Sequence, residues 1–135
     1  MSRALALTLR GRRRAEALMV DQCVITRQSG PPGPIDPDTG LREPPPTETV
    51  YSGRCKVQTY EPHESKPESG GHVFTVQRYY VHIPVGAGPL KVDDRVEVTV
   101  SQIAPHLVGR RYRVAGLHHK SMSTAQRLLV DEVTG

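Results

Sequence analysis

Six histidines and two cysteines are the side chains of this sequence best suited to chemistry. The histidines are His63, His72, His82, His106, His118 and His119. None stands in an HExxH zinc motif, and the chain has neither a Gly-x-Ser-x-Gly nucleophile elbow nor a glycine-rich phosphate loop. His118 and His119 are adjacent near a predicted strand end, where alternation would point them to opposite faces and keep them from sharing a metal. We therefore expect surface or interface histidines, no enzyme activity and no cofactor.

Cys23 and Cys55 each lie on the apolar side of a predicted strand, so they could face each other across a sheet. Three interpretations remain open: two small buried apolar residues, a disulfide formed in oxidising surroundings, or half of a metal site. We favour the first, because no CxxC or HxxxH spacing supplies further ligands. The pair Asp93–Asp94 could bind a cation, but its place between a Gly/Pro turn and a strand favours a solvated turn.

Basic charge is concentrated in residues 1–20, which predict a helix. Five arginines and one glutamate give this segment a net charge of +4, equal to that of the whole chain, so residues 21–135 are neutral. Ser2 can cap the helix, and Gly11 predicts a bend or a break. The candidate docking residues are Leu5 and Leu9 on one face and the cluster Arg10, Arg12, Arg13 and Arg14.

The arginine cluster has three interpretations. It could contact the phosphates of nucleic acid or lipid, pair with an acidic protein surface, or form a solvated helix face. Because the helix is apolar on one side and basic on another, we expect it to dock on a protein partner.

From residue 21 onward the apolar pattern has the period of two that is typical of β-strands. Strands are predicted at 21–28, 48–60, 72–83, 95–101, 110–119 and 125–133. Val96, Val98 and Val100 form the clearest inward face, and Gly116 is expected to make a β-bulge. Because an open six-stranded sheet would leave exposed edges, we predict a mainly β fold. It is a small antiparallel barrel, 21–135, preceded by the helical arm 1–20.

Two loops are too rich in proline, glycine and polar residues to join the sheet for long. The first, 29–46, holds seven prolines and a turn sequence that includes Asp36, Asp38 and Gly40, and we interpret it as an extended loop or hairpin tip. The second, 61–71, contains His63 and ends in Gly70 and Gly71. Both are expected to be mobile until a partner orders them.

The order of strands and turns resembles the head–tail joining, or head completion, proteins of long-tailed bacteriophages. The resemblance rests on Val24-Ile-Thr-Arg27, Val50-Tyr-Ser-Gly-Arg-Cys-Lys-Val-Gln58, His82-Ile-Pro84, Asp94-Arg-Val96 and Gly109-Arg-Arg-Tyr-Arg-Val-Ala-Gly116. It covers about 21–133 and is a pattern of strands and turns rather than one motif. The arm 1–20 resembles a variant found in phages of actinobacteria.

The resemblance implies a structural virion protein, a stopper at the neck between head and tail. Such proteins are made in the host cytoplasm and form a homo-oligomeric ring below the portal and its adaptor. They retain packaged DNA without sequence-specific contact and offer the surface on which a tail terminator or tail tube protein docks. One loop of each subunit enters the channel; by position, 29–46 or 61–71 is the candidate. A tail terminator or another tail-side ring protein is the alternative.

A nucleic-acid-binding β-barrel is the alternative of another class. It requires aromatic side chains interleaved with basic ones on an exposed strand, and Arg78-Tyr79-Tyr80 is the one such place in the sequence. A membrane partner is not expected, because no apolar run approaches the roughly 20 residues of a membrane span. The apolar stretch Ala4–Leu9 is likewise too short for a signal peptide.

Overall fold

The fold is described from a computed structural model, for residues 2–60 and 78–133. The predicted loop 61–71, with its candidate residues His63, Gly70 and Gly71, lies outside the described residues. So do residues 72–77 of the third predicted strand.

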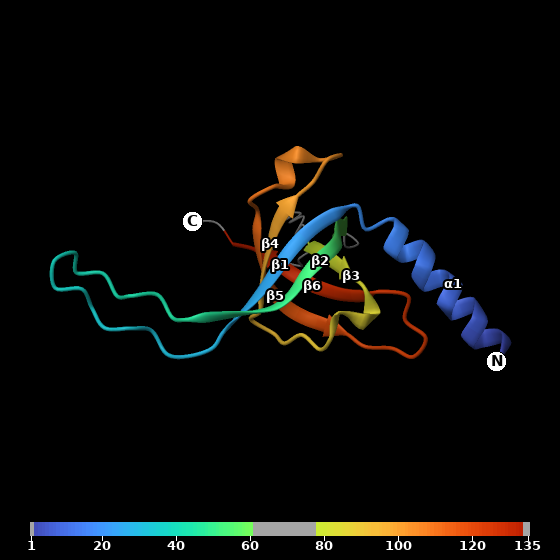
Figure 1. Ribbon diagram of the computed structural model, residues 1–135, viewed down its shortest axis with the longest axis horizontal. Helices are drawn as coiled ribbons and strands as arrows, with labels where there is room; N and C mark the ends of the chain where they lie inside the picture. The colour runs from blue at the N-terminus through green and yellow to red at the C-terminus, as the bar shows by residue number, and fades with distance from the viewer. Residues whose placement is uncertain (1, 61–77, 134–135) are drawn as a thin grey trace, which may run out of the picture.

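Six antiparallel strands close into one barrel, as predicted (Figure 1). They are β1 (Asp21–Gln28), β2 (Thr47–Tyr60), β3 (Arg78–Ile83), β4 (Arg95–Val100), β5 (Arg111–His118) and β6 (Gln126–Glu132). Their order around the barrel is β1-β2-β3-β6-β5-β4. Two three-stranded meanders, β1-β2-β3 and β4-β5-β6, therefore meet along β3–β6 and β1–β4. Closure pairs the outer strands of both meanders. The barrel thus avoids the exposed strand edges of an open sheet, which was the reason for predicting it.

Small and β-branched side chains fill the barrel. Its fully buried residues include Ile25, Val81, Ile83, Val96, Val98, Tyr112, Val114, Leu128 and Val130. Cys23 and Cys55 belong to the same core, and both are free thiols. A hydrogen bond with Cys23 and burial raise the pKa of the Cys55 thiol far above its ordinary value. The interpretation as small buried residues is thus confirmed.

The prediction that Val100 faces inward is wrong. Val100 is 41% exposed, whereas Val96 and Val98 are fully buried. The register between β1 and β4 shifts between Gln22 and Cys23, so strict alternation does not continue to the end of β4. Ser101 is buried there instead, and its hydroxyl donates a 2.7 Å hydrogen bond to Asp21 Oδ1. The predicted bulge at Gly116 is confirmed by the register shift between Val114 and Gly116.

The interpretation of Asp93–Asp94 as a solvated turn is wrong for Asp94, which is 1% exposed. Arg27 Nε and Nη2 donate to its two carboxylate oxygens, each at 2.9 Å, and the Lys91 amide donates a third bond of 2.8 Å. Burial alone would raise the pKa of Asp94. The hydrogen bonds from Arg27 and Lys91, together with their charges, outweigh it and hold the pKa below its ordinary value. The pair fastens the β3–β4 connection to the end of β1.

A single helix, α1 (Arg3–Ala17), precedes the barrel. The Ser2 hydroxyl accepts from the Leu5 amide at 3.1 Å and caps the helix as predicted. The helix runs through Gly11 without a break, and the glycine has another reason: a Cβ there would lie 2.8 Å from Thr124 Cγ2. Gly11 therefore lets the helix approach the β5–β6 loop. Within the described residues, no helix is long and apolar enough to cross a membrane.

Candidate functional site: a projecting hairpin, a helix and a basic hollow

The β1–β2 hairpin extends far beyond the barrel as two chain segments that run side by side (Figure 1). The segments are joined by bonds from the Ser29 amide to the Pro46 carbonyl at 2.8 Å and from the Gly33 amide to the Glu43 carbonyl at 3.0 Å. We call residues 29–46 the projecting hairpin. Of the two interpretations of this loop, the hairpin tip is confirmed.

A compact turn ends the projecting hairpin. The Asp38 amide donates to Asp36 Oδ1 at 2.9 Å, and the Gly40 amide donates to the Asp36 carbonyl at 2.8 Å. Gly40 has φ = 70°, the left-handed conformation that favours glycine. The Asp36 amide then donates to the Leu41 carbonyl at 2.8 Å and returns the chain to the ladder. Ile35 and Leu41, beside this turn, are 56% and 71% exposed.

The helix contacts the barrel through Gly11 and Arg12, and Arg12 belongs to the cluster expected to dock. Arg12 Nε donates to the Ser123 carbonyl at 2.9 Å, next to the close contact of Gly11. Leu5 is about half exposed, while Leu9 is partly buried. The other three arginines of the cluster are exposed: Arg10, Arg13 and Arg14. Arg12 thus differs from the other arginines of the cluster, because its side chain is bonded to the barrel.

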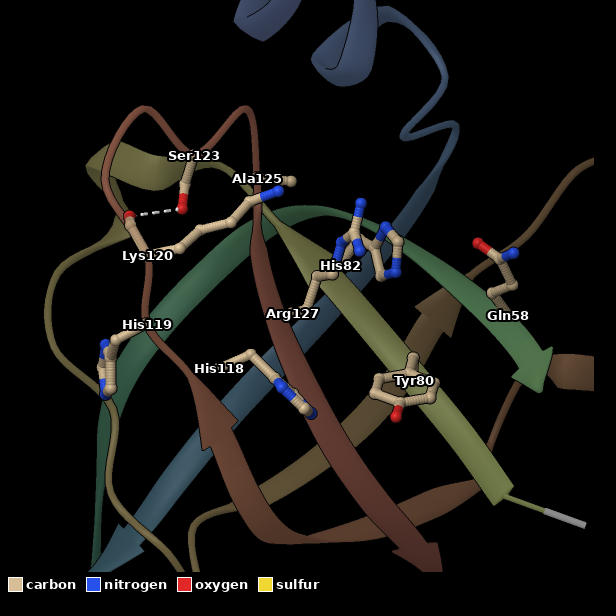
Figure 2. A pocket seen from close by; sticks show the side chains of 9 residues that line it. All are labelled: Gln58, Tyr80, His82, His118, His119, Lys120, Ser123, Ala125 and Arg127. Atoms are coloured by element: carbon tan, nitrogen blue, oxygen red, sulfur yellow. Dashed lines mark hydrogen bonds between the residues drawn. The ribbon is translucent and has the colours of Figure 1, made fainter. Parts of the chain in front are cut away.

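A hollow of about 510 Å³ lies on the outside of the barrel beside the β5–β6 loop (Figure 2). Its lining is mostly basic or polar: Gln58, Tyr80, His82, His118, His119, Lys120, Ser123, Ala125 and Arg127. His118 and His119 both line it, but in Figure 2 the His118 ring points toward Tyr80 and the His119 ring points away from it, so the two rings do not converge. β5 ends at His118, so strand alternation does not govern His119.

Four basic side chains, three of which line this hollow, form one row across the sheet. Lys56 on β2 pairs with His82 on β3, His82 pairs with Arg127 on β6, and Arg127 pairs with His118 on β5. We call these four residues the basic row. The next row on the same face contains Tyr80, whose ring centroid lies 5.6 Å from that of His118 at an interplanar angle of 47°.

The basic row creates a positive local potential. Partial burial and the positive charges of Arg127 and Lys56 lower the pKa of His82 to about 4. The ion pairs found in the described part of the chain join Arg27 to Asp94, Arg110 to Glu132, and Arg113 to Asp93 and Asp131. None of them includes a member of the basic row.

Sequence reasoning missed the basic row because its members are far apart in the chain. The alternation within each predicted strand indicates that these residues face outward. Only the registers of three strand pairs show that the four side chains lie in one row. Of the predicted stacking pair, Tyr80 faces the hollow, whereas Tyr79 packs against Tyr112 with ring centroids 5.7 Å apart. Across residues 2–60 and 78–133, no three potential metal ligands gather at one place.

A family model described as "Family of unknown function (DUF6093)" matches residues 11–131, which run from the middle of α1 to the end of the barrel. No curated protein matches the chain. Since the model covers most of the sequence and every strand of the barrel, the chain belongs to the DUF6093 family.

Proposed function

We propose that this protein is a structural component of a bacteriophage neck rather than an enzyme. In this proposal it is a stopper that forms a ring with copies of itself between the portal or its adaptor and the tail. It helps to retain packaged DNA and provides the surface to which the tail attaches. The observation that carries the proposal is the projecting hairpin.

The projecting hairpin is long for a barrel of this size. Eight residue-to-residue steps lead from the barrel end at Gln28 to the turn at Asp36, and at about 3.3 Å per step they reach about 25 Å. A two-stranded ribbon of this length has little to stabilise it alone. Its proline content limits the conformations open to the chain, which lowers the entropy lost when it docks. These properties suit an arm that reaches a neighbouring subunit or the channel.

The tip of the projecting hairpin is suited to contact with another protein. Ile35 and Leu41 flank the turn and expose large apolar side chains about 25 Å from the barrel, where no core of this chain can cover them. Helix α1 and its C-cap offer a second apolar surface through Leu7 and Leu18, which are each about half exposed and lie on one side of the helix, about three turns apart. Figure 1 shows the hairpin and the helix on opposite sides of the barrel. Two contact elements on opposite sides are what a head-to-tail ring requires of each subunit.

Inactivation of the gene in the phage that encodes it tests this function. We expect filled or leaking heads and free tails that fail to join, and restored infectious particles when the full chain is supplied in trans. A chain with Ile35→Ser and Leu41→Ser should fold but restore few particles. The matched control, Ile35→Val with Leu41→Met, keeps the tip apolar and should restore normal numbers. Normal tail attachment without the protein would exclude a stopper role.

A further inference from the structure

We propose that the outer face of β2, β3, β6 and β5 binds the phosphate backbone of nucleic acid through the basic row Lys56, His82, Arg127 and His118. This surface is separate from the projecting hairpin. The inference rests on the proposed neck function in one respect: in the virion, the nucleic acid that meets this face would be packaged duplex DNA.

The spacing of the basic row fits a line of phosphates. Neighbouring strands lie about 4.8 Å apart, so four side chains on four adjacent strands span about 14 Å. One strand of duplex DNA presents a phosphate about every 3.4 Å along the helix axis. Because the strand also winds around the axis, successive phosphates are about 7 Å apart in space, and the row extends over about three of them.

The fixed positive charges of the row are not neutralised within the described part of the chain. Lys56 and Arg127 lie on the strands at either side of His82, and the ion pairs of the described residues lie elsewhere. Burial, and then the charges of Arg127 and Lys56, lower the pKa of His82 to about 4, so this imidazole is neutral at pH 7 and can take part in a hydrogen bond without adding a charge. A bound polyanion would neutralise the charges of Lys56 and Arg127.

Further basic residues extend the row toward the helix. His119 and Lys120 continue it along the β5–β6 loop. A neighbouring hollow of about 450 Å³ shares these two residues with the first and is also lined by Arg12 of α1. The hydrogen bond from Arg12 to the Ser123 carbonyl fixes this arginine at the far end. The result is a continuous basic track from the barrel to the helix, although residues 21–135 have no net charge.

The aromatic side chains in the hollow favour nucleic acid over an acidic protein surface. Tyr80 lies beside the basic row with its ring tilted against that of His118, a member of the row. In single strands, planar rings next to a cationic groove are the usual platform for stacking bases, and stacking tolerates any sequence. Recognition of carboxylates on a protein needs the cations but not the rings.

Binding of the full chain to labelled 20-nucleotide DNA, duplex or single-stranded, tests the inference over a series of salt concentrations. Each phosphate neutralised contributes about −0.9 to the slope of log K against log salt for a duplex. The variant Lys56→Gln/Arg127→Gln should reduce the size of that slope by about 2 and weaken binding roughly 50-fold at about 0.1 M salt. The matched control Arg95→Gln/Arg111→Gln removes two exposed cations from β4 and β5, away from the row, and should change neither by much.

The thermal midpoint of each variant checks that the barrel is intact. A second variant, His119→Gln/Lys120→Gln, changes only the loop and should weaken binding in the same direction. Preference for duplex or for single strands identifies the source of the phosphates, and either supports the inference. Equal loss in the control, no binding by the full chain, or binding of poly-glutamate in place of DNA would overturn it. Because none of these measurements requires a ring, their failure is distinguishable from failure of the connector proposal.

Discussion

Replacement of Arg27 by Met is expected to destabilise the barrel by about 3 to 4 kcal/mol at pH 7. The Asp94 carboxylate, 1% exposed, would keep only the bond from the Lys91 amide. Removing one partner of a buried ion pair usually costs about 3 to 5 kcal/mol. We expect the lower half of that range because the Arg27 side chain is itself 25% exposed, so part of the site can admit water. With a urea slope near 2 kcal/mol per molar, the unfolding midpoint should fall by about 1.5 to 2 M.

The dependence of this loss on pH identifies its cause. In the natural chain the pKa of Asp94 is lowered, so its stabilising contribution is present above pH 4 and is lost as the pH falls through the folded pKa. In Arg27→Met, no guanidinium opposes the effect of burial, so the pKa of Asp94 rises. Protonation of Asp94 at lower pH then removes the unpaired buried charge and restores part of the lost stability. The gap between the two proteins should therefore narrow between pH 7 and about pH 4.5.

Urea denaturation followed by far-UV circular dichroism at both pH values measures this gap. Asp94→Asn and the double variant complete the cycle, and Asp94→Asn should partly rescue Arg27→Met because it removes the unpaired charge. A loss below about 1 kcal/mol at pH 7, or a gap that does not change with pH, would refute the assignment of a buried, paired carboxylate.

Four further predictions concern the core, the helix, the hairpin and the hollow. Val98→Asp should abolish cooperative folding, because it places an unpaired carboxylate in the fully buried core; a soluble variant with an unchanged thermal midpoint would contradict this. Removal of residues 2–17 should leave a barrel that melts cooperatively, since buried Met19 and Asp21 remain, and loss of its β-type circular dichroism would show that the helix is part of the core. Amides of the projecting hairpin should exchange rapidly in the free subunit and slowly in the assembled particle, and equal strong protection in both would show that the hairpin is not ordered by a partner. His82 should titrate near pH 4 by NMR, because burial and the charges of Arg127 and Lys56 oppose its protonation. The free energy of unfolding should therefore fall as the pH drops from about 6.5 to 4, and titration of His82 near pH 6.5 would contradict this.

The sequence predicts the strands well because one face of each is buried. The alternation of core residues such as Val96 and Val98 defines the strand whatever its neighbours are. β1 begins and ends at the predicted residues, and the other predicted strands agree with the described ones within one or two residues at each described end. The closed barrel was also predictable, from the number of short strands and the need to avoid exposed edges.

Features that depend on register or on contacts between distant segments were not predictable. Val100 faces outward because β1 shifts register against β4, a local irregularity that alternation does not report. The buried state of Asp94 depends on Arg27, 67 residues away in the chain. Gly11 was interpreted as a weak point in a helix, whereas its role is to admit Thr124 of the β5–β6 loop.

One part of the candidate site was likewise predictable from the sequence, and another part was not. The turn of the projecting hairpin is local, and Asp36 and Gly40 indicated it directly. The basic row needs three correct strand pairings before its residues meet, and its outward positions alone give no sign of alignment.

Cryo-electron microscopy of phage particles assembled with the chain tests the central claim most directly. We expect a ring of copies of this barrel at the neck, below the portal or its adaptor, with the projecting hairpin of each copy against a neighbouring subunit or inside the channel. Density for the barrel within the tail alone, or particles whose neck forms normally without it, would contradict a stopper role.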